Sequence, residues 1–423
     1  MRIVFLIPGT CEAFYCENCL RDLDLSEALR RLGHTVLLVP LYLPLTAEGG
    51  PPGEAPIFFG GIGVYLTERS AALRRAPAWL RRRLDSRRLL RWAARAVGLT
   101  SPHDLGESTL SMLRGEHGHQ ARELDRLALY LAEQGGADAV LLSNGLLVGL
   151  ARRLKDELRV PVAALLQDED AFLDGLPEEY SRAAWEAVAA RAADVDFFIA
   201  VSDHFRGVMI GRLGLAPDRV GVVRPGISPA TYEEASGRPD PPVVGFLSPA
   251  LHEKGLDLLV EAVLALREEP RLRGLRLRVT GGEAAGSRPF LGDLKARIRR
   301  SGRPEAIEFL PNLGRADRQA FLRGLSVLSV PARRPEACGL WVLEGLASGV
   351  PVVAPRHGGP VELIEATGGG MLVEPGSQAA LCDALRGLLL APDEARRLGR
   401  QGRRAVLEQF TADRAARELA AHL

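Results

Sequence analysis

The sequence predicts an α/β protein made of two doubly wound domains, each a parallel sheet with helices packed on it. Two observations predict this class. A strand–helix–strand unit opens the chain, and another spans residues 326–354. Both alternate short apolar runs with a helical apolar pattern, which is typical of parallel sheets joined by crossover helices. The length of 423 residues suits two domains, each large enough for its own core.

The composition of the chain limits the classes of molecule that the protein is expected to bind. The chain is 47% hydrophobic and 25% charged, which is typical of a globular protein. Its 54 basic and 53 acidic residues give a net charge of +1, so no overall field favours nucleic acid. The N-terminus MRIVFLIPG runs straight into a strand and lacks the pattern of a signal peptide. The odd count of five cysteines suggests a reducing compartment, and no run of about 18 apolar residues is present, so we expect a cytoplasmic protein without a membrane-spanning helix.

The first domain is expected to cover residues 1–228. Apolar runs predict strands over residues 2–7 and 35–40, with a helix over residues 20–32 that ends at Gly33. Arg21 and Asp22 lie in the first turn of that helix, where they either point into a ligand cleft or face solvent. Further strands are predicted over residues 137–143, 160–166, 197–201 and 220–224.

Residues 46–120 are the least regular part of this domain. The stretch from Arg69 to Arg95 is predicted to be helical, and it holds ten arginines interleaved with apolar residues that include Trp79 and Trp92. Such a segment either contacts anionic lipid head groups or a phosphorylated acceptor, or is simply a solvated insertion. Contact with lipid head groups would make the protein peripheral at a membrane.

Residues 229–241, PATYEEASGRPDP, are polar and proline-bearing, and they predict a linker between the domains. The second domain is expected over residues 242–407. Its predicted strands before the central stretch cover residues 243–247, 275–280 and 307–310. A terminal helix within residues 408–423 is expected to pack back on the first domain.

The cysteines and histidines give little sign of a metal site. Cys16 and Cys19 are spaced as half a zinc site or a redox pair, with Cys11 nearby, but no second pair completes a site. We therefore interpret them as thiols that line the first strand-to-helix turn. His117 and His119 are not spaced as ligands on one helix face. No metal is predicted.

The central stretch is residues 326–362, SVLSVPARRPEACGLWVLEGLASGVPVVAPRHGGPVE. A buried strand over residues 326–330 is followed by a loop that carries Glu336. A helix is predicted over residues 338–348, ending at Gly349, and the next strand covers residues 351–354. Ligands of such sheets bind outside the carboxyl ends of the strands, which is where Glu336 is expected to lie.

Two carboxylates frame the start of that helix. The backbone N–H groups of residues 337–340 are the unpaired donors of a helix N-terminus, which favour an anion. Glu344 lies about two turns into the helix, where it could accept hydrogen bonds from a ribose, and Glu336 stands in front of it. Spacing alone leaves open that both are ordinary charges near a helix start.

The wider context is more specific. PEACGLWVLEGLASGVPVVA, followed by HGGPVELI and the turn GGGMLVEPG, resembles the donor site of retaining glycosyltransferases of the GT-B fold, family 4. The resemblance implies two Rossmann-like domains facing across a cleft. It also implies transfer of a sugar from a UDP- or GDP-linked donor to an acceptor with retained anomeric configuration. No separate cofactor is implied.

The same resemblance assigns roles to individual residues. Glu336 would contact the sugar hydroxyls, Glu344 the ribose and Lys254 the diphosphate, and Asp168 would lie among the catalytic residues. Donor contacts would also come from Pro225 and Gly226, from Cys338, Gly339 and Leu340, and from Gly358 and Gly359.

The chain departs from the family pattern at three positions. Cys16 and Glu17 stand where paired glycines are usual, Gln167 replaces a histidine, and Pro249 replaces an arginine that binds phosphate. Arg224, Arg333 and Arg356 are the candidates to supply the missing cation. The departures leave two alternatives: a protein of this shape that binds a sugar nucleotide without transferring it, and a sugar-nucleotide epimerase.

Overall fold

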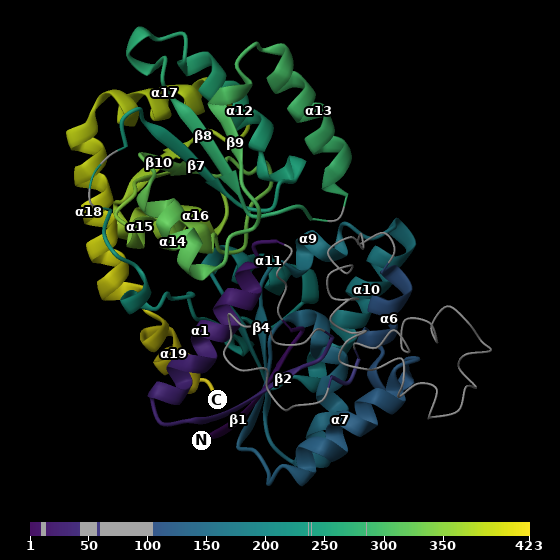
Figure 1. Ribbon diagram of the computed structural model, residues 1–423. Coiled ribbons are helices and arrows are strands. Elements are labelled where there is room, and N and C mark those ends of the chain that lie inside the picture. The colour runs from purple at the N-terminus through teal and green to yellow at the C-terminus, as the bar shows by residue number, and fades with distance from the viewer. Residues whose placement is uncertain (10–13, 43–56, 60–104, 236, 238, 285) are drawn as a thin grey trace. The chain divides into compact units, whose positions relative to one another are not determined.

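A computed structural model describes the chain except for residues 10–13, 43–56, 60–104, 236, 238 and 285. Contacts divide it into two units (Figure 1). The first holds residues 1–11, 18–224 and 415–423, and the second holds residues 12–17 and 225–414. Most of the predicted basic insertion, including the stretch from Arg69 to Arg95, lies outside the described residues. Its predicted contact with a membrane or an anionic acceptor stays a prediction.

The described residues of the first unit form a six-stranded sheet in the order β2-β1-β3-β4-β5-β6, with every neighbouring pair parallel. Its strands are β1 (Arg2–Ile7), β2 (Thr35–Pro40), β3 (Ala139–Leu142), β4 (Val162–Leu166), β5 (Phe197–Ala200) and β6 (Val220–Val222). Its helices are α1 (Glu17–Arg31), α6 (Gly106–Leu113), α7 (Ala121–Glu133), α8 (Ala151–Leu158), α9 (Glu169–Leu173), α10 (Glu178–Arg191) and α11 (Asp203–Leu213).

The second unit repeats this plan with the order β12-β11-β10-β7-β8-β9, again all parallel. Its strands are β7 (Val243–Leu247), β8 (Arg276–Thr280), β9 (Ile307–Phe309), β10 (Val327–Ser329), β11 (Val352–Pro355) and β12 (Gly370–Val373). Its helices are α12 (Leu256–Leu266), α13 (Ser287–Arg300), α14 (Arg315–Arg323), α15 (Leu340–Ala347), α16 (Gly359–Thr367), α17 (Gln378–Leu390) and α18 (Pro392–Gln409). The last helix of the chain, α19, covers Ala412–Ala420.

These sheets confirm the predicted α/β class of two doubly wound units. Their central strands are buried apolar runs, as parallel sheets covered by helices require. Across the described residues, no helix combines the length and the apolarity needed to cross a membrane.

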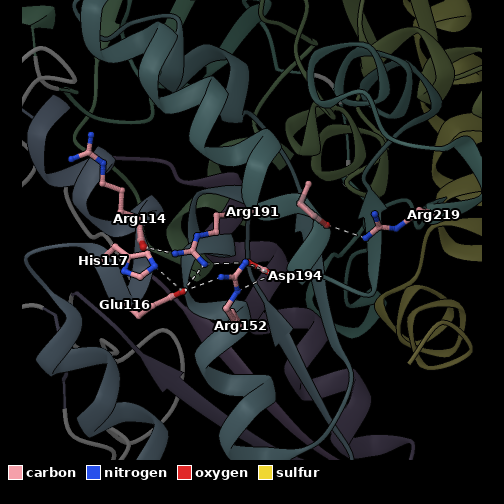
Figure 2. Close-up of polar contacts among 8 residues, drawn as sticks. Arg114, Glu116, His117, Arg152, Arg191, Asp194 and Arg219 are labelled. Atoms are coloured by element: carbon pink, nitrogen blue, oxygen red, sulfur yellow. Dashed lines mark hydrogen bonds and ion pairs between the residues drawn. The ribbon is translucent and has the colours of Figure 1, made fainter.

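An ionic cluster braces the first unit around the end of α10 (Figure 2). The guanidinium of Arg191 donates to Glu116 at 2.9 Å, to Asp194 at 3.2 Å and to the carbonyl of Arg114. Arg152 joins the same two carboxylates. The pKa of the Glu116 carboxyl is lowered, because bonds and charge from Arg191 outweigh the cost of burial. The cluster ties the turn after α6 to the end of α10.

Candidate functional site

Glu336 lies in the loop between β10 and α15, and two donors hold its carboxylate. Lys254 Nζ donates to Oε1 at 2.5 Å, and the indole Nε1 of Trp341 donates to Oε2 at 3.0 Å. Glu336 is 8% exposed, so pairing with a cation offsets much of the cost of burying its charge. The structure therefore brings together two of the predicted site residues, Glu336 and Lys254.

Glycines bring the neighbouring loops close to Glu336. Gly358 has φ +71°, and a Cβ there would lie 2.6 Å from the backbone oxygen of Glu336. The next amide, Gly359 N, donates to that oxygen at 2.8 Å. Only glycine combines this left-handed conformation with so close an approach. Gly358 and Gly359 thus fix where the Glu336 backbone lies, next to the start of α16.

Helix α15 begins at Leu340, two residues later than the sequence indicated, because Gly339 adopts φ +84°. A residue in this left-handed conformation cannot continue a helix, so Gly339 precedes the first helical residue. Ala337 and Cys338 are buried in the loop before it. The prediction that all four amides of residues 337–340 belong to a helix N-terminus is therefore wrong for Ala337 and Cys338, and only those of Gly339 and Leu340 lie at the helix start.

Glu344 is 1% exposed, and protein donors occupy both of its oxygens. The Tyr15 hydroxyl donates to Oε2 at 2.5 Å. Oε1 accepts from the Tyr232 hydroxyl at 2.6 Å and from Arg318 Nε at 3.0 Å. The carboxylate that the sequence assigns to a ribose is thus the centre of a buried network in the second unit.

The groups around Glu344 keep definite protonation states. Burial and the charge of Glu344 raise the pKa of the Tyr15 hydroxyl well above its ordinary value, so Tyr15 stays a neutral donor. Burial works to lower the pKa of the Arg318 guanidinium, but Glu344 raises it overall. The network therefore contains one cation and one anion, a buried pair with two hydroxyl bonds.

Sequence reasoning missed Tyr15, Tyr232, Arg318 and Trp341. A signal was available for Arg318 alone. It precedes buried Phe321 and Leu322 by three and four residues in α14, a spacing that puts it on the inward face of the helix. Tyr232 lies within the predicted linker, where a buried tyrosine was not expected.

The three arginines that could replace the cation lost at Pro249 differ in their partners. Arg333 forms a bidentate salt bridge with Asp257, with N–O distances of 2.7 and 2.8 Å. Its guanidinium is therefore already paired, close in sequence to Lys254 through Asp257. Arg224 pairs with Asp203 in the first unit. Arg356 is exposed directly after β11, and in the described part of the chain its side chain has no ion-pair partner.

Pro225 and Gly226 are buried against the segment that joins α18 to α19. A Cβ on Gly226 would lie 2.2 Å from the Thr411 backbone, and Ile227 pairs with Thr411 in a parallel bridge. The structure thus places these two predicted donor contacts in a tight backbone crossing. Their role in donor binding stays a prediction.

In the first unit, the carboxyl ends of β3 and β4 carry a second buried polar group. Arg21, 5% exposed, donates to Asp22 and to Gln167 Oε1, the latter at 2.8 Å. The alternative that Arg21 and Asp22 lie on a solvated turn is therefore wrong. Because a guanidinium can only donate, it fixes the Gln167 amide with its oxygen toward Arg21.

Asp168 precedes α9 with φ +62°, a conformation that only glycine, Asn and Asp adopt readily, and its side chain does not cap the helix. The next residue, Glu169, is 1% exposed and accepts from Gly145 N at 2.7 Å. Its other oxygen, Oε2, accepts no hydrogen bond from any of the residues that the structure describes. Burial raises the pKa of the Glu169 carboxyl to about 7.

Among the described cysteines, Cys16, Cys19, Cys338 and Cys382, no two are joined by a disulfide. Within the described ranges, no group of three or more His, Cys, Asp or Glu side chains could hold a metal ion.

Comparison with known proteins gives the family. Residues 230–405 match the model of Glycosyl transferases group 1. The chain is 30% identical over 327 residues to a D-inositol 3-phosphate glycosyltransferase of Kineococcus radiotolerans, covering 72% of each chain. It is also 30% identical over 185 residues to a GDP-mannose-dependent phosphatidylinositol monomannoside mannosyltransferase of Mycobacterium tuberculosis, covering 42% of this chain and 46% of that one.

Solved structures agree on the fold. Sucrose-phosphate synthase from Thermosynechococcus elongatus superposes with a TM-score of 0.71 at 16% identity, covering 100% of this chain and 98% of that one. Anabaena HepE in complex with UDP-glucose gives 0.70 at 17% identity, covering 100% and 99%. The predicted GT-B fold is confirmed, and the chain belongs to the glycosyl transferases group 1 family and is a glycosyltransferase.

Proposed function

We propose that this glycosyltransferase takes a sugar from a UDP- or GDP-linked donor held by its second unit and transfers it with retained anomeric configuration. The observation that carries the proposal is the Lys254–Glu336 pair beyond the carboxyl end of β10, beside the start of α15. A cation, a carboxylate and helix amides at one strand end can bind a diphosphate and sugar hydroxyls. The complex of HepE with UDP-glucose supports the class of donor.

In this proposal, Glu336 accepts hydrogen bonds from hydroxyls of the donor sugar, and Lys254 binds the diphosphate. Lys254 now bonds Glu336, so a bound diphosphate would share the ammonium, which has three donors. The amides of Cys338, Gly339 and Leu340 stabilise the charge that grows on the leaving diphosphate. Asp168 and its neighbours in the first unit remain the candidates for the acceptor side.

The nucleotide sites can be tested by isothermal titration with UDP and GDP. Lys254→Ala should nearly abolish binding, because helix-dipole effects contribute only about 0.3–1 kcal/mol and cannot replace an ammonium. Glu336→Gln should change nucleotide affinity little while it depresses transfer. Unchanged binding by Lys254→Ala would place the diphosphate elsewhere.

The second phosphate cation is proposed to be Arg356, since Arg333 is committed to Asp257. Arg356→Ala should weaken UDP or GDP binding roughly tenfold, as loss of a hydrogen bond to a charged group does, and less at high salt. Arg224→Ala is the matched control, because Arg224 lies in the first unit and pairs with Asp203. Equal effects of the two changes would remove Arg356 from the site.

Retention can be tested without knowing the acceptor. Slow hydrolysis of an α-linked nucleotide sugar should release the α-anomer first, and NMR recorded before the anomers equilibrate would detect it. Initial release of the β-anomer would indicate inversion. Several relatives have inositol in their names, so inositol phosphates are the first acceptors to test.

A further inference from the structure

Residues Phe14–Glu17, which belong to the second unit, pack on the rest of that unit through backbone contacts. Phe14 forms an antiparallel bridge with Gly282, and Tyr15 N donates to Gly281 O at 2.9 Å. Both glycines follow directly after β8 and have positive φ, 121° for Gly281 and 76° for Gly282. Two successive backbone contacts hold this short segment in a fixed register at that strand end.

Held there, the segment brings a hydroxyl to Glu344. Tyr15 is 4% exposed, donates to Glu344 Oε2 at 2.5 Å, and its ring centre lies 5.6 Å from the Arg318 guanidinium carbon. A ribose would present the same group, a neutral hydroxyl, to the same acceptor. Tyr15 therefore makes the contact with Glu344 that the sequence assigns to a ribose hydroxyl.

The two oxygens of Glu344 are used differently. Oε1 accepts hydrogen bonds from Tyr232 and Arg318, which lie within residues 225–414 of the second unit. Oε2 accepts the hydrogen bond from Tyr15. Displacing Tyr15 would free Oε2 and leave the ion pair with Arg318 intact. The network can thus open on one side without leaving a buried charge unpaired.

The same segment brings a carboxylate to the start of α15. Glu17 Oε1 accepts from the backbone N–H of Trp341, the second residue of the helix, at 3.4 Å. A helix N-terminus favours an anion, whether a side-chain carboxylate or a phosphate. The Glu17 carboxylate therefore lies at a position where a phosphate would also be stabilised.

We propose that residues Phe14–Glu17 are an internal occupant of the donor site, with the Tyr15 hydroxyl in place of a ribose hydroxyl and the Glu17 carboxylate in place of a phosphate. The proposal rests on the proposed function, because it takes the donor to be a nucleotide sugar. A nucleotide then binds by displacing both side chains. The site is held closed until a ligand supplies both a hydroxyl pair and an anion.

Substitutions that keep shape and remove one contact test this directly. Tyr15→Phe should tighten UDP or GDP binding roughly tenfold in isothermal titration, because the competing bond to a charged acceptor is lost. Glu17→Gln should tighten it by a smaller factor, and more at low salt. Tyr232→Phe is the matched control: it removes the other tyrosine bond to Glu344, from Oε1, and should not tighten binding.

Hydrogen exchange gives a second readout that does not depend on affinity. A saturating nucleotide should speed exchange of the Tyr15 amide, which is now bonded to Gly281 O, if the segment leaves its place. Unchanged or weaker binding by Tyr15→Phe, together with an amide that stays protected, would overturn the proposal. Failure of the proposed function looks different: the parent and every variant would then bind neither UDP nor GDP, and the occupant would have nothing to replace.

Discussion

The buried ion pair of Glu344 and Arg318 is expected to contribute strongly to the free energy of unfolding. Each is less than 5% exposed, and the two lie 3.0 Å apart. Glu344→Ala should cost about 3–5 kcal/mol in the free energy of unfolding, because Arg318 would be left as an unpaired buried cation. Urea unfolding measures the loss.

The control for this change is Glu308→Ala. Glu308 also pairs with an arginine, Arg278, but its side chain is 52% exposed, so its loss should cost less than about 1 kcal/mol. Equal costs at the two positions would show that the Glu344 network is not a buried ion pair in solution. Glu344→Gln keeps the shape and is the better variant for ligand titration.

Glu169 predicts a pH dependence of opposite sign to that of a salt-bridged acid. Burial raises the pKa of its carboxyl from 4.5 to about 7 in the folded state, so the folded protein holds a proton that the unfolded chain has lost. Stability should therefore fall as pH rises from about 4.5 to 7, by roughly 3 kcal/mol at 1.36 kcal/mol per pH unit. Glu169→Gln should remove this slope in urea unfolding at pH 5 and pH 8. A parallel slope in the variant would assign it to other groups.

At the residue scale, sequence reasoning reached the residues that belong to a motif and missed their partners. Glu336 and Lys254 were both singled out, but their direct bond was not predicted. The donors to Glu344 were missed because they come from far along the chain: Tyr15 lies 329 residues away and Tyr232 lies 112 away. No local periodicity links such positions.

Elements were easier to predict than side-chain partners. Strands β1, β2 and β7 begin and end at the predicted residues, because each is an apolar run with clear boundaries. Helix α1 begins three residues before the predicted start, at Glu17, and α15 begins two residues after it. Both differences lie at turns that carry residues of the proposed donor site, so local propensity does not decide them alone.

The loop that precedes α16 gives a test at the element scale. Gly358→Ala should destabilise the second unit and lower transfer, because a Cβ would press 2.6 Å from the Glu336 backbone oxygen and displace its carboxylate. Gly376→Ala is the control, since Gly376 has nearly the same φ, +73° against +71°, but no atom within 4 Å. The cost of a positive φ, about 1–2 kcal/mol, is then common to both, while the backbone contact and the ψ of −168° are features of Gly358. Equal losses of activity would mean that the crowding of Glu336 has no effect.

At the scale of the whole molecule, two separate cores predict two unfolding events. A nucleotide at 100 times its Kd stabilises the unit that binds it by about 2.7 kcal/mol. In calorimetry, UDP or GDP should therefore raise the midpoint temperature of one unfolding transition. Glu344→Ala should lower the midpoint temperature of that same transition. A shift confined to the other transition would place the nucleotide in the first unit.

The number and class of the units followed from length and from the repeated strand–helix–strand pattern. The position of the join is less clear from composition. The contacts divide the chain between Arg224 and Pro225, whereas polar and proline-rich composition indicated residues 229–241. A single buried tyrosine in a polar stretch changes composition too little to be noticed, although it bonds the central carboxylate of the second unit.

That tyrosine decides where this enzyme could be recombined with a relative. A chimera crossed over after residue 241 would take Tyr232 from one parent and Glu344 from the other. It would also take Gly226 and Ile227 from one parent and the Thr411 backbone, which they contact closely, from the other. A crossover between Arg224 and Pro225 keeps each of these pairs within one parent. Exchange of whole donor halves between such enzymes should begin at that bond.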